Sequence, residues 1–269
     1  MDSPAPGLKV VYPRAEQASD RRDDYPLALL ALALAKTRKA YELRPHPVFM
    51  LQVRAISELE QGRSVDVIWT TTSVERERSL LPVRVPIDRG LMGWRLLLVR
   101  GKSLPRFAAL ASADELKRLR GGLGFDWPDA AVLRHSGFSV DESVRYSDIF
   151  LKLAHDRIDY FSRSVQEIWG ELETHREADF VIEPTLALHY PAAMYFFVNR
   201  RNLTLANDIQ RGLELSMLDG SFEALFQQHF GALLKRAELG RRHVIELPNP
   251  LLPPETPLQD RRLWFRPQR

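Results

Sequence analysis

Hydrophobic residues in the first third of the chain alternate between the spacing typical of strands and that typical of helices. Leu8 to Tyr12 is strand-like and ends at Pro13, whereas 24–39 carries Leu and Ala at nearly every position, as a mostly buried helix does. The further expected elements are a short strand within 40–49, a helix from about Leu51 to Gln61 and a strand from Val65 to Trp69. Strand, helix, strand, helix, strand is the order of a parallel α/β sheet.

The rest of the chain repeats this alternation, which predicts a second α/β unit. The expected strands are 91–99, 121–124, 159–161, 180–182 and 194–198. The expected helices are 113–120, 128–134, 147–155, 166–172, 205–218 and 222–237. Recurring prolines after Arg241 predict a tail without regular structure, and its interspersed Leu, Trp and Phe residues predict that this tail packs over the folded body.

One pattern occurs in both halves of the chain: a helix-like run ends in a turn and restarts as a strand with an aspartate. The two copies are residues 56–69, with Asp66, and residues 150–161, with Asp159. Each strand runs into a polar segment that carries an arginine, Arg76 in the first half and Arg163 in the second. Open α/β sheets bind ligands beyond the carboxyl ends of their strands. The pattern therefore predicts two similar lobes with ligand-binding groups at these two places.

Composition narrows the classes of partner and site. With 45% hydrophobic and 27% charged residues, the 269-residue chain can fold around one large or two ordinary cores. The formal net charge is only +3 and no helix-turn-helix, zinc-finger or RNP-type motif occurs, so we expect no binding to nucleic acid. The absence of cysteine excludes disulfides and thiolate sites, and the seven histidines lack ligand spacing. We therefore expect no metal and no cofactor.

The sequence shows no segment expected to cross a membrane. The apolar run Leu27–Ala35 is too short to span a bilayer and lies too late for a signal peptide. A soluble chain is therefore expected. Its start at Met1 leaves two alternatives open: a native cytoplasmic start, or an artificial start on a mature exported protein whose signal peptide has been removed.

Five short motifs together resemble a known family. They are Leu59–Asp66, Ser73–Arg76, Pro86–Gly90, Leu153–Asp159 and Asp219–Phe222. Their order and separations, over residues 8–240, resemble the type II periplasmic solute-binding proteins, in particular the family that binds polar amino acids for ABC importers. The resemblance implies two α/β lobes joined by two hinge crossovers and closing on a small ligand. The implied bounds are 1–88 plus 193–245 for lobe one, 89–192 for lobe two, and 246–269 for a proline-rich tail packing on the lobes.

The resemblance also assigns ligand-binding residues in the first lobe. Arg76 aligns with the arginine that grips the α-carboxylate of the ligand in family members, in a motif that begins at Ser73. A guanidinium offers a planar fork that pairs bidentately with a carboxylate and keeps its charge. The alternative is that Arg76 is a surface residue within the charged run 75–78.

The second lobe departs from the family pattern. Amino-acid binders commonly carry an aspartate there that pairs with the ligand's ammonium group, whereas this chain has Ser162, Arg163 and Ser164. An arginine at that place would repel an ammonium group and attract a second anionic group. Glu167 or Asp126 could supply a substitute acceptor, although Glu167 could equally be an exposed carboxylate on a helix.

Aromatic residues at or just past predicted strand ends are further candidates for the ligand site. They are Tyr12, Trp69, Trp127 and Tyr195. Such rings could sandwich a ligand, and packing in the core is the alternative for each, favoured for Tyr195. Trp127 stands beside a predicted helix N-terminus, whose free backbone donors favour anions, and is therefore the strongest aromatic candidate.

The resemblance implies a non-catalytic protein that captures a carboxylate-bearing polar solute, such as an amino acid or a related organic anion, in an interlobe cleft for ABC import or sensing. It implies a monomer, a membrane permease or receptor as partner, and a periplasmic location with the signal peptide removed. The alternative is an enzyme on the same fold, similar to cyclohexadienyl dehydratases, with Glu167 or Asp126 as its acid, although no catalytic constellation is evident. A regulator's effector-binding domain would need a helix-turn-helix, for which the residues before Leu8 are too few.

Overall fold

The computed structural model describes residues 7–15, 21–125 and 127–268, and its chain divides into two compact units. Unit 1 comprises Met1–Arg89, Ala193–Ala232 and Pro253–Trp264, and unit 2 comprises Gly90–Ala192, Leu233–Leu252 and Phe265–Arg269. The chain thus leaves unit 1 after Arg89 and returns at Ala193, and its C-terminal part alternates further between the units. Residues 233–245, expected in lobe one, belong to unit 2, because the strand that ends this stretch pairs there.

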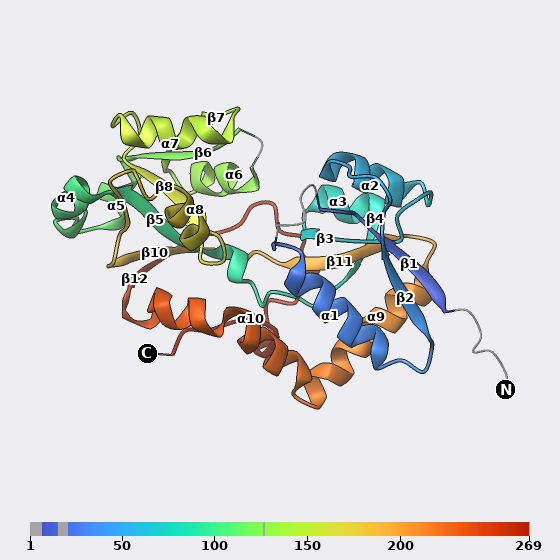
Figure 1. Ribbon diagram of the computed structural model, residues 1–269. Helices are drawn as coiled ribbons and strands as arrows, with labels where there is room; N and C mark the ends of the chain where they lie inside the picture. Colours follow the sequence, from blue (N-terminus) through green and yellow to red (C-terminus); the bar gives the residue numbers. More distant parts are fainter. Residues whose placement is uncertain (1–6, 16–20, 126, 269) are drawn as a thin grey trace, which may run out of the picture. The chain divides into compact units, whose positions relative to one another are not determined.

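Unit 1 contains two small sheets covered by helices (Figure 1). Its strands are β1 (Leu8–Tyr12), β2 (Tyr41–Pro45), β3 (Val67–Thr71), β4 (Leu80–Val83) and β11 (Met194–Asn199). Its helices are α1 (Asp24–Ala35), α2 (Gln52–Glu60), α3 (Val74–Ser79), α9 (Leu203–Leu218) and the first part of α10 (Ser221–Ala237). β1 and β2 pair in parallel, as expected, but β11 lies between β3 and β4 and runs antiparallel to both. The expected all-parallel sheet is therefore wrong here, because the central strand comes from the returning segment.

The core of unit 1 forms where α2 covers the β3–β11 pair. Its buried residues are Met50, Ala55, Leu59, Val65, Ile68, Leu80, Ala193, Tyr195 and Phe197. Tyr195 is fully buried, so core packing, the favoured alternative for this residue, is confirmed. On another side α1 and α9 run beside each other (Figure 1), and Gly212 of α9 lies directly against the backbone of Ala33.

Unit 2 is built on one mixed sheet of seven strands. In spatial order the strands are β12 (His243–Glu246), β10 (Leu186–His189), β5 (Trp94–Arg100), β8 (Tyr160–Ser164), β6 (Arg120–Gly124) and β7 (Ser139–Ser143), with β9 (Phe180–Ile182) also paired to β5. Its helices are α4 (Leu104–Ala108), α5 (Ala113–Lys117), α6 (Pro128–His135), α7 (Tyr146–Ala154) and α8 (Ile168–Thr174). β6, β7 and β8 are parallel neighbours, and α6 and α7 pack beside β6 (Figure 1).

The repeated helix–turn–strand pattern has the same structural role in both units. Asp66, just before β3, accepts a hydrogen bond from the backbone N–H of Val11 in β1 at 2.8 Å and donates its own N–H to the Val11 carbonyl at 2.8 Å. Asp159, just before β8, makes the same reciprocal pair with Arg120 of β6, at 2.7 and 2.8 Å. Each aspartate therefore fixes the register of a strand in its own unit.

The backbone before each aspartate is also alike. Gly62 and Asp156 each lie two residues beyond a helix, and both adopt left-handed backbone, with φ of 64° and 57°. Glycine favours this conformation and ends helices readily, whereas an aspartate in it is less common. The two copies are therefore one local design with a different turn residue.

The C-terminal tail is more ordered than the prolines suggest. The expectation of no regular structure is wrong for β12, which pairs in parallel with β10, because prolines begin only after this strand. Further on, Asn249 donates to the Pro191 carbonyl at 2.8 Å in unit 2. The Trp264 indole N–H donates to the Pro257 carbonyl at 3.0 Å, and the ring packs against the core of unit 1. None of the helices in the described ranges combines the length and apolarity needed to cross a membrane.

Candidate functional site

The first candidate group lies where β3 leads into α3 in unit 1. The Ser73 hydroxyl caps this helix by accepting a hydrogen bond from the backbone N–H of Arg76 at 3.2 Å. The Arg76 side chain turns back toward the end of β3, where its Nη1 donates to the Thr71 carbonyl at 2.7 Å. The helix cap and this return bond together fix the guanidinium next to the strand end.

Arg76 is half-buried and has no anionic partner among the residues that the structure describes. Across residues 7–15, 21–125 and 127–268, no carboxylate lies within ion-pairing distance of its guanidinium. Burial lowers the pKa of Arg76, and the nearby charge of Glu75 only partly opposes this effect. Glu77 is engaged elsewhere, because it accepts hydrogen bonds from Thr72 and from Arg84. The site thus holds a partly desolvated cation whose bond partner is a neutral carbonyl.

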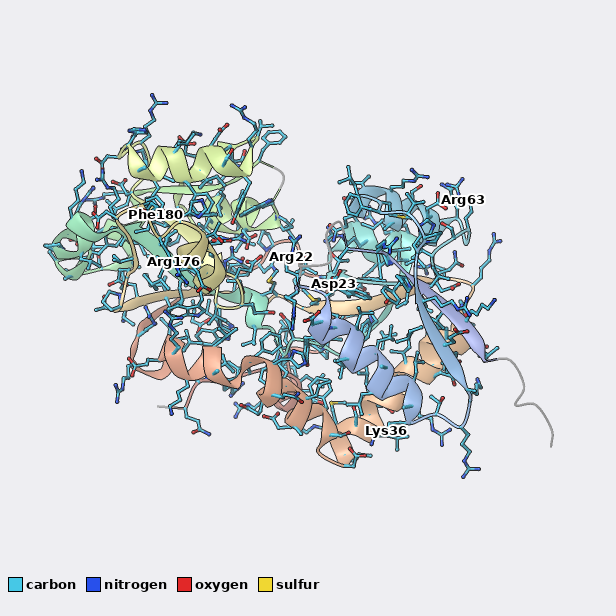
Figure 2. The ribbon with its side chains drawn as sticks, in the orientation of Figure 1. Arg22, Asp23, Lys36, Arg63, Arg176 and Phe180 are labelled. Atoms are coloured by element: carbon cyan, nitrogen blue, oxygen red, sulfur yellow. The ribbon has the colours of Figure 1, made fainter. Side chains whose placement is uncertain are left out.

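Two predicted aromatic residues come together in the same unit. The rings of Tyr12, at the end of β1, and Trp69, in β3, lie 5.9 Å apart between centroids. The Trp69 indole N–H donates to Asp23, labelled at the start of α1 in Figure 2, at 2.8 Å. Burial and the charge of Asp23 raise the pKa of Tyr12. Trp69 also meets Phe196 edge-on at 6.4 Å, so its ring packs into the unit as well as flanking the strand ends.

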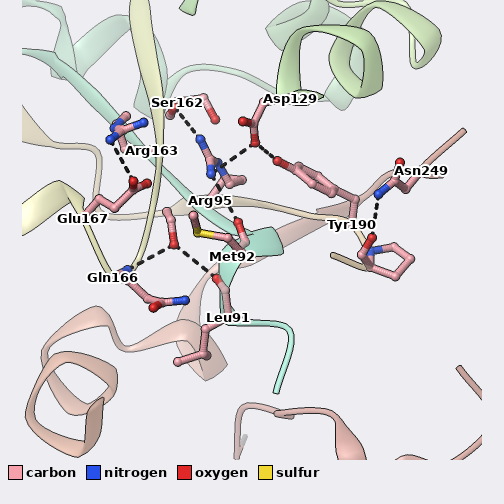
Figure 3. A network of polar contacts seen from close by, with 12 residues as sticks. Leu91, Met92, Arg95, Asp129, Ser162, Arg163, Gln166, Glu167, Tyr190 and Asn249 are labelled. Atoms are coloured by element: carbon pink, nitrogen blue, oxygen red, sulfur yellow. Dashed lines mark hydrogen bonds and ion pairs between the residues drawn. The ribbon is translucent and has the colours of Figure 1, made fainter. Parts of the chain in front are cut away.

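The second candidate group surrounds Arg163, on β8 of unit 2 (Figure 3). Its side chain is 9% exposed, and it pairs with two carboxylates that follow it along the chain. Nε donates to Glu171 Oε1 at 2.5 Å. Nη2 lies 3.0 Å from Glu167 Oε1, a contact that Figure 3 shows. The positive charge of Arg163 is therefore balanced within the chain, where sequence analysis expected it to attract a second anion of the ligand.

Aromatic rings enclose the same guanidinium. Its central carbon lies 4.6 Å from the ring centroid of Trp127, 5.2 Å from that of Phe161 and 5.8 Å from that of Tyr146. Trp127 immediately precedes α6, and Tyr146 is the first residue of α7. Phe161 stands two residues before Arg163 on β8. Three elements thus converge on one side chain, with the predicted candidate Trp127 as the closest ring.

A buried arginine lies beneath this group (Figure 3). Arg95 on β5 is 1% exposed, donates to the Ser162 carbonyl at 3.0 Å and lies 3.2 Å from Asp129 Oδ1. Asp129 also accepts a hydrogen bond from the Tyr190 hydroxyl. Burial alone would lower the pKa of Arg95, but the negative charges around it, Asp129 first, hold that pKa above its usual value. The network joins β5, β8, α6 and the end of β10.

The structure distributes the predicted residues over both units. Tyr12, Trp69, Ser73 and Arg76 lie in unit 1; Trp127, Ser162, Arg163 and Glu167 lie in unit 2; Asp126 lies outside the described residues. Ser162 is fully buried. Its bond to Arg95 is made by its backbone carbonyl and not by its side chain. Within the described ranges no cluster of three potential metal ligands is found.

Sequence analysis missed Glu171, Tyr146 and Arg95. Glu171 stands four residues after Glu167, the helical spacing that places two side chains on one face, and this spacing could have revealed it. Arg95 stands beside the apolar run 96–99 in the middle of β5, and a buried arginine in such a place needs an acidic partner. Tyr146 carries no comparable signal, because only the fold brings it to Arg163.

We expect Glu171 to make the stability of the protein depend on pH. Burial raises its pKa, and Arg163 opposes this effect only in part. A carboxyl group whose pKa is raised by folding binds more protons in the folded state, so stability falls as pH rises from about 4.3 through the raised value. The free energy of unfolding of the wild type should therefore fall, relative to that of Glu171→Gln, as the pH is raised from about 4 to about 7. A constant difference between the two proteins across this range would contradict the prediction.

Comparison with solved structures identifies the fold. The probable extracellular-binding protein YtmK of an amino-acid ABC transporter from Bacillus subtilis matches with a TM-score of 0.63 and 17% identity, covering 84% of this chain and 98% of its own. An ancestral arginine-binding protein bound to arginine matches with a TM-score of 0.56 and 18% identity, over 84% and 98% of the two chains. A histidine kinase sensor domain with similarity to periplasmic binding proteins matches at 0.56 and 17%, over 84% and 96%.

These likenesses cover nearly the whole of the matched chains at low sequence identity. They confirm the expected α/β architecture of the type II periplasmic-binding fold. No protein-family model matches the sequence, and no curated protein matches it. The ligands of the matched proteins therefore suggest which compounds to test with this chain.

Proposed function

We propose that this chain, which has the type II periplasmic-binding fold, is a solute-binding protein that uses Arg76 to hold a carboxylate of its ligand. The observation that carries the proposal is the half-buried guanidinium of Arg76 without an acidic partner among the described residues. A guanidinium has five N–H donors, and Thr71 engages one of its nitrogens, so donors remain for a bidentate carboxylate. Binding an anion there would offset the desolvation of the cation.

The solute class follows from this chemistry. A small polar molecule with a carboxylate, an amino acid or a related organic anion, would satisfy the fork of Arg76. Solved structures of the same fold include an ancestral arginine-binding protein bound to arginine and an ancestral arginine-binding protein bound to glutamine, and both ligands carry a carboxylate. These structures support the choice of compounds to test and leave the identity of the ligand to experiment.

A binding role fits the unit 2 group better than catalysis does. Glu167, a candidate acid for the enzyme alternative, is ion-paired to Arg163, so its carboxylate already has a partner within the chain. We further infer a monomer that delivers its solute to a membrane permease or receptor outside the cytoplasm. The matched proteins include an extracellular-binding protein of a transporter and a sensor domain, which supports both kinds of partner.

A thermal-shift screen of ligand-stripped protein tests the proposal. The panel contains amino acids, opines, dicarboxylates and small aromatic acids. A ligand at a hundred times its dissociation constant stabilises the folded state by about 2.7 kcal/mol, which raises the unfolding midpoint by several degrees in a chain of this size. Recovery of the ligand unchanged in mass shows binding, and its conversion to a product would favour the enzyme alternative.

Arg76→Met should abolish the midpoint shift caused by whichever carboxylate the wild type binds. The matched control is Arg78→Met, because Arg78 lies in the same helix, is exposed and makes no ion pair with any described residue. This control should respond to the ligand as the wild type does. An undiminished shift in Arg76→Met would exclude Arg76 as the carboxylate-binding residue.

A further inference from the structure

The environment of Arg163 has the composition of a binding site for a planar cation. Trp127, Phe161 and Tyr146 present rings within 4.6 to 5.8 Å of its guanidinium carbon. Aromatic faces attract cations through the ring quadrupole, and the guanidinium group stacks on them best because it is planar and weakly hydrated. Two carboxylates complete the surroundings, one on Nε and one on Nη2.

The two carboxylates have more acceptor oxygens than Arg163 engages. Oε2 of Glu167 is buried and makes no hydrogen bond with the described part of the chain, and the carboxylate of Glu171 faces the Tyr146 hydroxyl as well as Arg163. Tyr146 lies close enough to Glu171 for burial and that carboxylate together to raise the pKa of the Tyr146 hydroxyl. Glu171 itself is 9% exposed. Both acids pair directly with Arg163, whereas neighbouring Arg95, on whose charge they also act, is bonded to Asp129 and to backbone carbonyls.

We propose that Trp127, Tyr146, Phe161, Glu167 and Glu171 form a guanidinium-binding cage that the chain fills with its own Arg163. The cage residues come from four places in the chain, and only Phe161 and Glu167 lie within four residues of Arg163. The cage is thus a product of the tertiary structure and would persist when the arginine side chain is removed. Its vacated form would take a free cation of the guanidinium class.

An occupied cage limits what the native protein can bind in unit 2. While Arg163 occupies the cage, Glu167 and Glu171 are committed to it and are closed to cationic solutes. Glu167 therefore does not serve as the substitute acceptor for an ammonium group that its position suggests. The cage is independent of Arg76, so the solute screen and the cage experiment can fail separately.

Chemical rescue of Arg163→Ala tests the proposal, with methylguanidinium as the probe. The variant should unfold at a lower temperature than the wild type, and millimolar methylguanidinium should raise its midpoint by several degrees in a saturable manner. The wild type should show no such rise, because its cage is filled. Sodium chloride and tetramethylammonium chloride at the same concentration control for ionic strength and for a cation that cannot donate hydrogen bonds.

Two further variants make the result specific to the cage. Arg163→Met fills the same volume with an apolar chain and should not respond to methylguanidinium. Arg163→Ala combined with Glu171→Gln should lose most of the response, because one carboxylate is gone. A midpoint of Arg163→Ala that methylguanidinium moves no more than it moves that of the wild type would overturn the proposal.

The proposal stays testable if Arg163→Ala does not fold alone. The denatured variant is then refolded with and without methylguanidinium, and the yield of soluble protein is measured. A yield that rises several-fold with methylguanidinium, and not with tetramethylammonium, supports the cage. Equal yields under all three conditions overturn it.

Discussion

Arg95→Met is expected to lower the free energy of unfolding by about 3 to 5 kcal/mol, the usual cost of breaking a buried ion pair from one side. The substitution leaves Asp129 with Tyr190 as its remaining partner and deprives the Ser162 carbonyl of its donor. Unfilled acceptors in a buried region cost more than a lost surface contact. The fall should appear in calorimetry of the ligand-free protein as a lowering of the midpoint by about 10 °C.

The same substitution at Arg100 is the matched control. Arg100 lies on the same strand but pairs with the exposed Asp156, so Arg100→Met should cost under about 1 kcal/mol. The double variant Arg95→Met with Asp129→Asn should recover part of the loss, since it removes both charges. A cost for Arg95→Met no larger than that for Arg100→Met would show that the network does not stabilise unit 2.

Gly212→Ala is expected to destabilise the protein by about 2 to 3 kcal/mol, against the usual helix preference for alanine. A Cβ at this position of α9 would lie 1.9 Å from the carbonyl oxygen of Ala33 in α1. The obstacle is backbone, which cannot rotate away as a side chain can, so the two helices would have to separate. Equilibrium denaturation should therefore show a lower denaturant midpoint than that of the wild type.

Gly170→Ala is the control for this prediction. Gly170 also lies in a helix, but a Cβ there would meet no atom within 4 Å. Alanine at that position should be neutral or stabilise by up to about 1 kcal/mol through its helix propensity. Two alanine substitutions with opposite signs would isolate the close approach of α1 and α9 as the cause. Gly212→Ala with the stability of the wild type would mean that the helices can move apart freely.

The sequence predicted the long helices well and missed several of the short strands. Helices with clear apolar spacing, such as α9 and α10, lie close to their expected positions. The strands β4, β7, β10 and β12 were missed, and each has only four or five residues. Such a strand depends on partners far away in the chain, as β12 does on β10, and a local pattern carries no information about that pairing.

The candidate site also combines features that the sequence predicted with features that depend on distant contacts. The motif around Arg76 pointed to the end of β3, where the guanidinium lies, and the structure adds the absence of an acid beside it within the described ranges. At Arg163 the sequence placed a charge at the end of a strand but could not show its environment. The ring of Tyr146 and the carboxylate of Glu171 come to it from two separate helices.

The sequence by itself determined two α/β units, a repeated aspartate turn in each, the type of fold and an arginine candidate for a carboxylate. The units and the turns follow from local spacing and turn chemistry, which act between residues a few positions apart, whereas the type of fold and the arginine follow from the resemblance of five motifs to a known family. The tertiary structure alone decided that β11 runs antiparallel inside unit 1 and that Arg163 is enclosed by rings and paired with acids. Pairing of strands and neutralisation of buried charges depend on contacts between distant residues, and the folded chain creates those contacts.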